Sequence, residues 1–215
     1  MNMALITLVC FAVKEEARFF DRLAGGRSQV RILLTGMGAR NAERTVRVAL
    51  STERPNQVLS CGFAGGLNPG LTSGTVIYAA DEKSELEARL RAAGARPASF
   101  HCAARVATTA EQKRKLRETT GTDAVEMESQ FIRDLCREKA IPSATVRVIL
   151  DPAGEDLPLD FNELMTPDQR LSARKMALAL MRSPSKLGGL LRLQKQGEAA
   201  AQRLAEVLGR VVGAG

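Results

Sequence analysis

Residues 4–23 read ALITLVCFAVKEEARFFDRL, and this stretch shows in miniature how the chain is built. Its first part, residues 4–11, is a continuous apolar run of the kind typical of a buried strand. Its second part, residues 14–23, spaces its apolar side chains as one face of a helix. A buried strand followed at once by an amphipathic helix predicts one unit of an α/β fold.

The same alternation continues along most of the chain. It predicts a three-layer α/β/α sandwich with a mixed, largely parallel central sheet and additional C-terminal helices. We expect one domain over residues 1–215, with residues 165–215 as a basic helical extension of it. Further strands are expected over residues 30–34, 57–61, 74–80, 99–108, 124–127 and 144–150. Helices are expected over residues 39–50, 84–93, 110–119, 128–140, 168–182 and 187–212.

Positive charge is concentrated at the C-terminal end. The net charge is +7, and residues 165–215 hold nine Lys or Arg against three Asp or Glu. Nucleic acid is not the expected partner, because aromatic residues make up only 4% of the chain and no binding motif is present. Two interpretations of residues 187–212 stay open. The segment is either an amphipathic helix packed on the core or an interfacial segment that rests on anionic lipid.

Cysteine and histidine usage argues against several kinds of site. The only histidine, His101, sits in a strand-like run, so we expect no metal site and no histidine-based nucleophilic mechanism. The N-terminal run lacks a basic segment and is read as a strand, and no apolar run approaches the ~20 residues of a membrane span. Scattered free thiols suit the cytoplasm. The cysteines are Cys10, Cys61, Cys102 and Cys136.

Two glutamates lie where strands give way to helices. Glu16 and Glu128 each fall on the apolar stripe of the helix that they open, which predicts that both are buried. Burying a carboxylate costs several kcal/mol unless it is paired or bound to a ligand. Each could instead serve only as a favourable anion at a helix start. Because open α/β sheets bind ligands at the carboxyl ends of their strands, we expect a site there.

A third acid, Asp151, ends the apolar strand 144–150. Arg147 lies four residues earlier and points to the same face, so the two could form a structural ion pair. Asp151 could equally be a cleft acid with a tuned pKa. The turn Gly36-Met37-Gly38 is a weak motif by itself, although its backbone N–H groups could hold an anion or a sugar.

Five segments form an ordered set along the chain: residues 12–16, 35–42, 61–67, 124–129 and 147–151. Together, in this order, they resemble the nucleoside phosphorylase-I superfamily, which includes the methylthioadenosine/S-adenosylhomocysteine nucleosidases. The resemblance covers residues 4–151. A narrower similarity, to the hopanoid-associated phosphorylases, rests on Asp151-Pro152-Ala153, on Leu157-Pro158 and on the leucine-rich tail around residues 184–193.

The resemblance implies a role for each of these segments. Asp151 would be the general acid for purine N7, and Glu16 would orient the attacking water. Glu128 with Met127 would bind the ribose hydroxyls, and Arg147 would support the region of Asp151 electrostatically. The remaining residues would line the nucleophile and sugar pocket: Phe63, Ala64, Gly65, Gly36, Gly38 and, as a candidate phosphate ligand, Arg40.

The function that the resemblance implies is cleavage of the N-glycosidic bond of an adenine nucleoside. The leading expectation is phosphorolysis of a 5′-substituted adenosine such as adenosylhopane, with inorganic phosphate as co-substrate and no cofactor. The alternatives are a hydrolase of methylthioadenosine or S-adenosylhomocysteine and a non-catalytic nucleoside- or lipid-binding protein. Phe63 replaces a small hydroxyl residue of the nucleosidases, so the nucleophile stays open. A homo-oligomer at the inner membrane surface is also expected.

Overall fold

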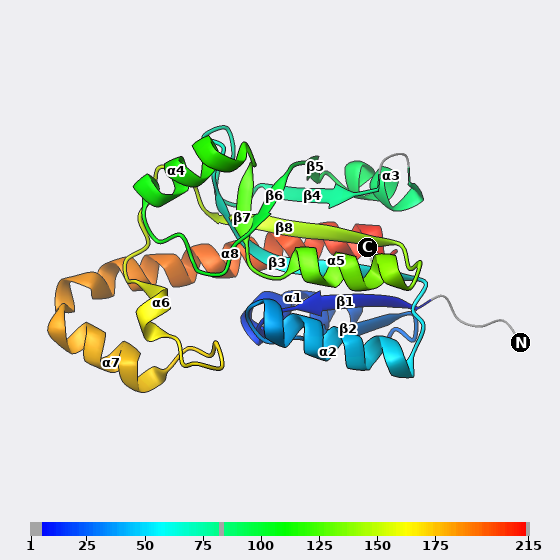
Figure 1. The fold of residues 1–215 in the computed structure, drawn as a ribbon, viewed down its shortest axis with the longest axis horizontal. Helices are drawn as coiled ribbons and strands as arrows, with labels where there is room; N and C mark the ends of the chain where they lie inside the picture. Colours follow the sequence, from blue (N-terminus) through cyan, green and yellow to red (C-terminus); the bar gives the residue numbers. More distant parts are fainter. Residues whose placement is uncertain (1–5, 82–83, 214–215) are drawn as a thin grey trace, which may run out of the picture.

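A twisted β-sheet with helices on both faces forms the body of the molecule (Figure 1), in a computed structural model that describes residues 6–81 and 84–213. The strands are β1 (Thr7–Phe11), β2 (Val30–Leu34), β3 (Gln57–Gly66), β4 (Val76–Ala80), β5 (Arg96–Pro97), β6 (Phe100–Cys102), β7 (Ala124–Glu126) and β8 (Ser143–Asp151). The helices are α1 (Lys14–Ala24), α2 (Ala39–Thr52), α3 (Glu85–Ala92), α4 (Ala110–Thr120), α5 (Ser129–Glu138), α6 (Phe161–Leu164), α7 (Ala173–Arg182), the 3-10 turn η1 (Pro184–Lys186) and α8 (Leu187–Val211).

The sheet is mixed and largely parallel, as predicted. Its main path runs β2–β1–β3–β8–β4–β5, with β7 paired to β3 and β6 paired to β7. The central strands β1, β3 and β8 are parallel, whereas β4 runs antiparallel to β8 and β7 antiparallel to β3. The parallel strands therefore end at one edge of the sheet, which is where ligand sites of α/β folds form.

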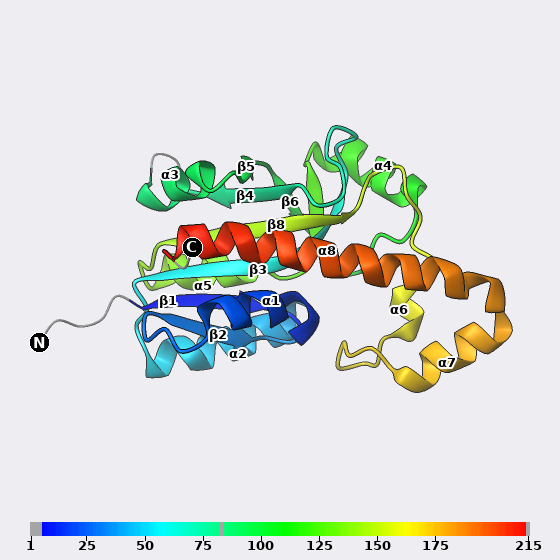
Figure 2. The same ribbon diagram turned by 180° about the vertical axis from the view of Figure 1, so that it is seen from behind.

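Alternating side chains of β1 show how the two outer layers are held. Leu8 and Cys10 pack with α2 and α5 on one face, whereas Val9 and Phe11 pack with α1 and α8 on the other. Burial on both faces explains why the strand is continuously apolar. Figures 1 and 2 show the helices on opposite sides of the sheet, which confirms the three-layer sandwich. Cys10, Cys61 and Cys136 are buried free thiols.

Several predicted boundaries were wrong. β3 continues to Gly66 instead of ending at residue 61, because its far end pairs with both β8 and β7. The strand expected over residues 99–108 is only β6, because its partner β7 is three residues long and the chain then leaves the sheet. His101 lies in this short strand. The strand expected from residue 4 begins at Thr7, and residues 4 and 5 lie outside the described residues.

The C-terminal segment divides into two parts that differ in burial. The second half of α8 belongs to the core, where Ala200, Leu204 and Leu208 pack against the sheet. In contrast, no residue from 165 to 199 is buried, and Figures 1 and 2 show α7 and the first turns of α8 projecting from the body. We call residues 165–199 the arm. Within the described residues, no helix is both long and apolar enough to cross a membrane.

Candidate functional site

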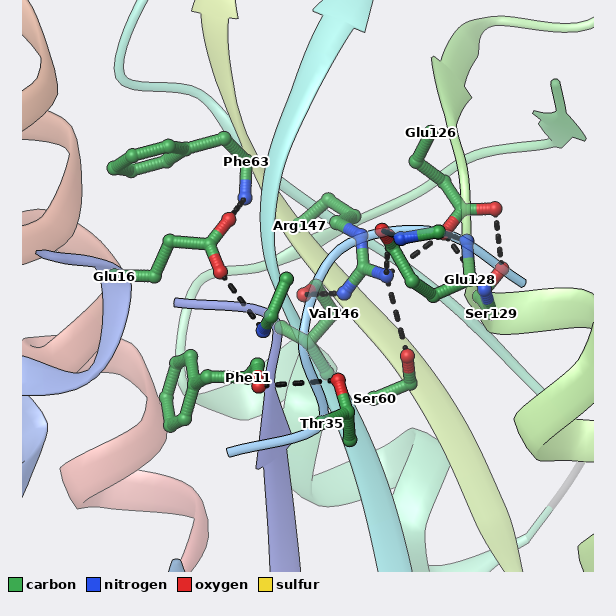
Figure 3. Close-up of polar contacts among 12 residues, drawn as sticks. Phe11, Glu16, Thr35, Ser60, Phe63, Glu126, Glu128, Ser129, Val146 and Arg147 are labelled. Atoms are coloured by element: carbon green, nitrogen blue, oxygen red, sulfur yellow. Dashed lines mark hydrogen bonds and ion pairs between the residues drawn. The ribbon is translucent and has the colours of Figure 1, made fainter. Parts of the chain in front are cut away.

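A buried arginine lies at the centre of the site (Figure 3). The strand β8 carries Arg147 into the interior, where its side chain is 2% exposed. Its Nη2 donates to Oε2 of Glu126 at 2.7 Å and to Oγ of Ser60 at 3.2 Å. Oε2 of Glu128 lies 3.7 Å from the same nitrogen. Burial alone would lower the pKa of Arg147, but the fields of the surrounding glutamates outweigh it, so the guanidinium stays charged.

Glu126 is a member of the site that sequence reasoning missed. Its carboxylate accepts hydrogen bonds from the backbone N–H groups of Glu128 and Ser129 and from the hydroxyl of Ser129. Burial raises the pKa of Glu126, yet Arg147 and these donors bring it below the usual value. The available signal was the arginine inside an apolar strand, because a buried guanidinium requires an ionised partner.

Glu128 is buried, as its place on the apolar stripe of α5 predicted, with 9% of its surface exposed. It stands directly before α5, and its Oε1 accepts the backbone N–H of Gly38 at 2.7 Å. Burial raises the pKa of Glu128 to about 7, although Arg147 opposes this rise. The Gly36–Gly38 turn and the start of α5 are thereby joined through one carboxylate.

Glu16 is also buried as predicted, at 7% exposed, and its carboxylate binds the backbone of two strand ends. Its Oε1 accepts the N–H of Phe63 at 2.8 Å, and its Oε2 accepts the N–H of Ala12 at 3.0 Å. Burial raises the pKa of Glu16. A Cβ at Gly62, whose φ is +148°, would lie 2.6 Å from Oε1 of Glu16, so glycine is required for this close approach.

Asp151 lies at the end of β8 as expected, but its partner is not Arg147. Four residues of strand span roughly 13 Å, too far for an ion pair along one face. Instead, Oδ2 of Asp151 lies 2.6 Å from Nζ of Lys113 in α4, a residue that the sequence did not single out. Burial raises the pKa of Asp151 to about 6, against the opposing effect of Lys113.

The structure brings the predicted residues of β3 and of the glycine turn to these carboxylates, but it does not bring Arg40 into contact with them. Phe63, Ala64 and Gly65 follow one another in β3, and Gly65 pairs in register with Asp151. Gly36 and Gly38 have φ values of +81° and +80°, which glycine adopts without strain. Arg40 is exposed in the first turn of α2, with no hydrogen bond or ion pair to the described residues.

A cavity of about 370 Å³ lies between Met127 and the arm. Met127, between the two site glutamates, lines one side of it, and Met165, Gln169 and Lys175 line the other. The arm also contacts the glycine turn, because Nδ2 of Asn41 donates to the carbonyl of Asp168 at 3.0 Å. The Gln169 side chain occupies the space that a Cβ at Gly38 would take. The arm therefore packs against the glycine turn and shares a cavity with Met127.

The arrangement suits two kinds of chemistry. Glu126 and Glu128 lie beside the guanidinium of Arg147, and Glu16 lies within its field, so the cluster holds three carboxyl groups against one positive charge. Such a cluster can accept hydrogen bonds from hydroxyl groups and can stabilise a positive centre nearby. Asp151, which titrates near neutrality, is suited to donate or accept a proton.

Comparison with known proteins gives a consistent result. The family model of the phosphorylase superfamily matches residues 10–101 and 85–182. The structure is similar to futalosine hydrolase of Helicobacter pylori, with a TM-score of 0.72, 16% identity and 99% of each chain covered. It is also similar to the 5′-methylthioadenosine/S-adenosylhomocysteine nucleosidase of Colwellia psychrerythraea in complex with adenine. That match has a TM-score of 0.71 and 16% identity, and it covers 99% of this chain and 96% of the other. The corresponding Helicobacter pylori nucleosidase, with 5′-methylthioadenosine in its active site, gives a TM-score of 0.68 and 15% identity, covering 96% and 99% of the two chains.

Proposed function

The chain belongs to the phosphorylase superfamily, and we propose that it cleaves the N-glycosidic bond of an adenine nucleoside and releases adenine. One observation carries the proposal: a buried cluster of carboxylates lies around Arg147 at the strand ends, and Asp151 lies at the end of the same strand. The first supplies groups for a sugar and the second supplies a proton donor.

In the proposed mechanism the glutamates bind the sugar. Glu128 accepts hydrogen bonds from the ribose hydroxyls beside Met127, and its Oε1 is at present held by the N–H of Gly38. Asp151 donates a proton to purine N7 as the bond from C1′ to N9 lengthens. The ribose then develops oxocarbenium character, and the excess of carboxylates around Arg147 stabilises that positive charge. Glu16 orients the nucleophile from the other side of β3.

We propose inorganic phosphate as the nucleophile, held at the Gly36–Gly38 turn and by Arg40. The support is the position of the turn at the start of α2, where the first N–H groups of a helix have no intrahelical acceptor, and the exposed guanidinium of Arg40, which makes no hydrogen bond or ion pair with the described residues. A second candidate is water, because the N–H of Gly38 already bonds Glu128 and the nearby carboxylates repel an anion. Hydrolysis is thus the alternative to phosphorolysis.

For the 5′ substituent we propose a large apolar group, as in a lipid-linked adenosine such as adenosylhopane. The cavity beside Met127 is walled by the arm, and the outer surface of the arm is both apolar and basic. Five of the nine exposed large hydrophobic side chains in the described residues lie on it: Leu171, Leu178, Met181, Leu187 and Leu191. The arm also carries seven Lys or Arg against two acids. These features support contact of the arm with an anionic membrane surface.

The first experiment measures adenine release by HPLC from adenosylhopane and from methylthioadenosine, with and without phosphate. Release from adenosylhopane only when phosphate is present is the expected result. Release without phosphate would establish a hydrolase. No adenine from either nucleoside, combined with tight nucleoside binding, would contradict catalysis and favour a binding protein. Self-association and a cytoplasmic location stay predictions. Light scattering would test the first, and cell fractionation would test the second.

Membrane contact is tested by co-sedimentation with vesicles that contain anionic phospholipid. Replacing Leu178, Met181 and Leu187 by serine should abolish sedimentation while leaving the fold intact, because none of the three is buried. The matched control replaces Leu23 and Val48, which are equally exposed on the body. Equal sedimentation of the arm variant and the control variant would show that the arm does not bind lipid.

A further inference from the structure

A second buried cation lies beside the proposed proton donor. Lys113 in α4 is 0% exposed, and its Nζ lies 2.6 Å from Oδ2 of Asp151. The same nitrogen donates to the carbonyl oxygens of Pro152 at 2.9 Å and Glu155 at 2.7 Å. Lysine is almost never fully buried unless it is paired. The ammonium is therefore tied to the end of β8 and to the segment that follows it.

We propose that Lys113 is a positioning residue that determines which oxygen of Asp151 carries the proton to the base. The inference rests on the proposed function, in which Asp151 is the acid. An ammonium has three donors and no acceptor. Oδ2 therefore accepts from Lys113, and the transferable proton resides on Oδ1. When Oδ1 gives its proton to N7, the electron pair of the O–H bond stays on the carboxylate, beside the ammonium that stabilises it.

The charges around Asp151 determine how readily it releases this proton. Burial raises its pKa to about 6, Lys113 opposes that rise, and Glu155 in the following loop adds to it. From β3 the carboxyl faces Gly65, which carries no charge. Without Lys113 the buried carboxyl would hold its proton to a higher pH and would be a weaker acid.

The test is Lys113→Met, with Lys115→Met on the exposed face of α4 as the matched control. With the nucleoside that releases adenine in the HPLC assay, we expect kcat on the acid side of the pH–rate profile, where the carboxyl is protonated in both proteins, to fall about 10- to 100-fold and KM to stay unchanged. The alkaline limb of the pH–rate profile should move up by about one unit or more. Carbon-13 NMR of the Asp151 carboxyl, assigned with Asp151→Asn, should show the same upward shift without any turnover. An unmoved limb together with an unmoved carboxyl titration would overturn the inference.

The double variant Lys113→Met/Asp151→Asn keeps the test decisive if the single variant does not fold. Removing both members of a buried ion pair is better tolerated than removing one. If Lys113 acts through Asp151, the double variant should have the same kcat as Asp151→Asn. A further loss of rate would show that Lys113 acts through something else. A near-wild-type rate for Asp151→Asn would instead refute the proposed mechanism, so the two failures are distinguishable.

Discussion

Two buried cations organise the carboxyl edge of the sheet, and they do so in opposite ways. Arg147 on β8 is shared by Glu126 and Glu128 and lies in the field of Glu16. Lys113 on α4 serves one carboxylate, that of Asp151. The first arrangement leaves negative charge in excess, which suits a sugar that becomes positive. The second arrangement pairs one ammonium with one carboxylate, and the pKa of that carboxyl, on Asp151, is raised to about 6.

The largest effect is expected from removing the acid of the balanced pair. Asp151→Asn should lower the rate of adenine release by about 2–4 orders of magnitude, because the amide cannot donate a proton to N7 as a carboxylic acid does. The measurement is kcat by HPLC at saturating nucleoside. Glu163→Gln, on the exposed side of α6, is the matched control and should keep the wild-type rate. Equal rates for the two variants would mean that the proton comes from elsewhere.

Removing Arg147, the cation that Glu126 and Glu128 share, should lower the stability of the fold. Arg147→Met would leave Glu126 buried without its counter-charge, so we expect a loss of about 3–5 kcal/mol in the free energy of unfolding. Urea denaturation followed by circular dichroism measures it. Arg31→Met is the matched control, since Arg31 is also a strand arginine paired with a glutamate, Glu53, but both are exposed. The control should lose less than about 1 kcal/mol. Similar losses would show that Arg147 is not the structural centre of the cluster.

The contrast between the two cations also shows what the sequence could and could not predict. The burial of Glu16 and Glu128 was predictable, because helical periodicity places both on the apolar stripe of a helix. A carboxylate is costly to bury there unless it is paired or bound to a ligand. Lys113 was not, because α4 reads AEQKRKLRETT, a helix with no clear apolar stripe from which burial could be inferred. Its burial arises from the loop after β8, which folds over α4 from forty residues away in the sequence.

Pairing errors have the same origin as these omissions. Strand rise separates Arg147 from Asp151, the register of β8 shifts between Ile149 and Asp151, and each of the two side chains is paired with a residue of another element. Glu126 was overlooked because a glutamate that ends a short strand has no periodic signal of its own.

The arm is a different case. Its amphipathic pattern fits the core equally well, and only the tertiary structure shows that residues 165–199 hold no buried side chain.

The smallest and most discriminating effect concerns two glutamates that share one arginine. The pKa of Glu128 is raised from 4.5 to about 7, whereas that of Glu126 is lowered. A raised pKa means that the stabilising contribution of Glu128 is complete below pH 4.5 and is lost as the pH rises through 7. A lowered pKa means that the contribution of Glu126 is present above pH 4.5 and is lost on acidification.

Glutamine mimics the neutral carboxyl, so the two variants should diverge as the pH rises. Glu128→Gln should gain about 2–3 kcal/mol in the free energy of unfolding at pH 8.5 relative to wild type, and little at pH 4.5. Glu126→Gln should lose stability at pH 8.5, because it gives up the ion pair with Arg147. Denaturation at both pH values measures each difference. The expected gain for Glu128→Gln would come with weaker nucleoside binding, since the ionised carboxylate is the better acceptor for the ribose hydroxyls. If both variants lost stability equally at pH 8.5, Glu126 and Glu128 would be equivalent partners of Arg147, and the excess of negative charge would not be held ready for the sugar.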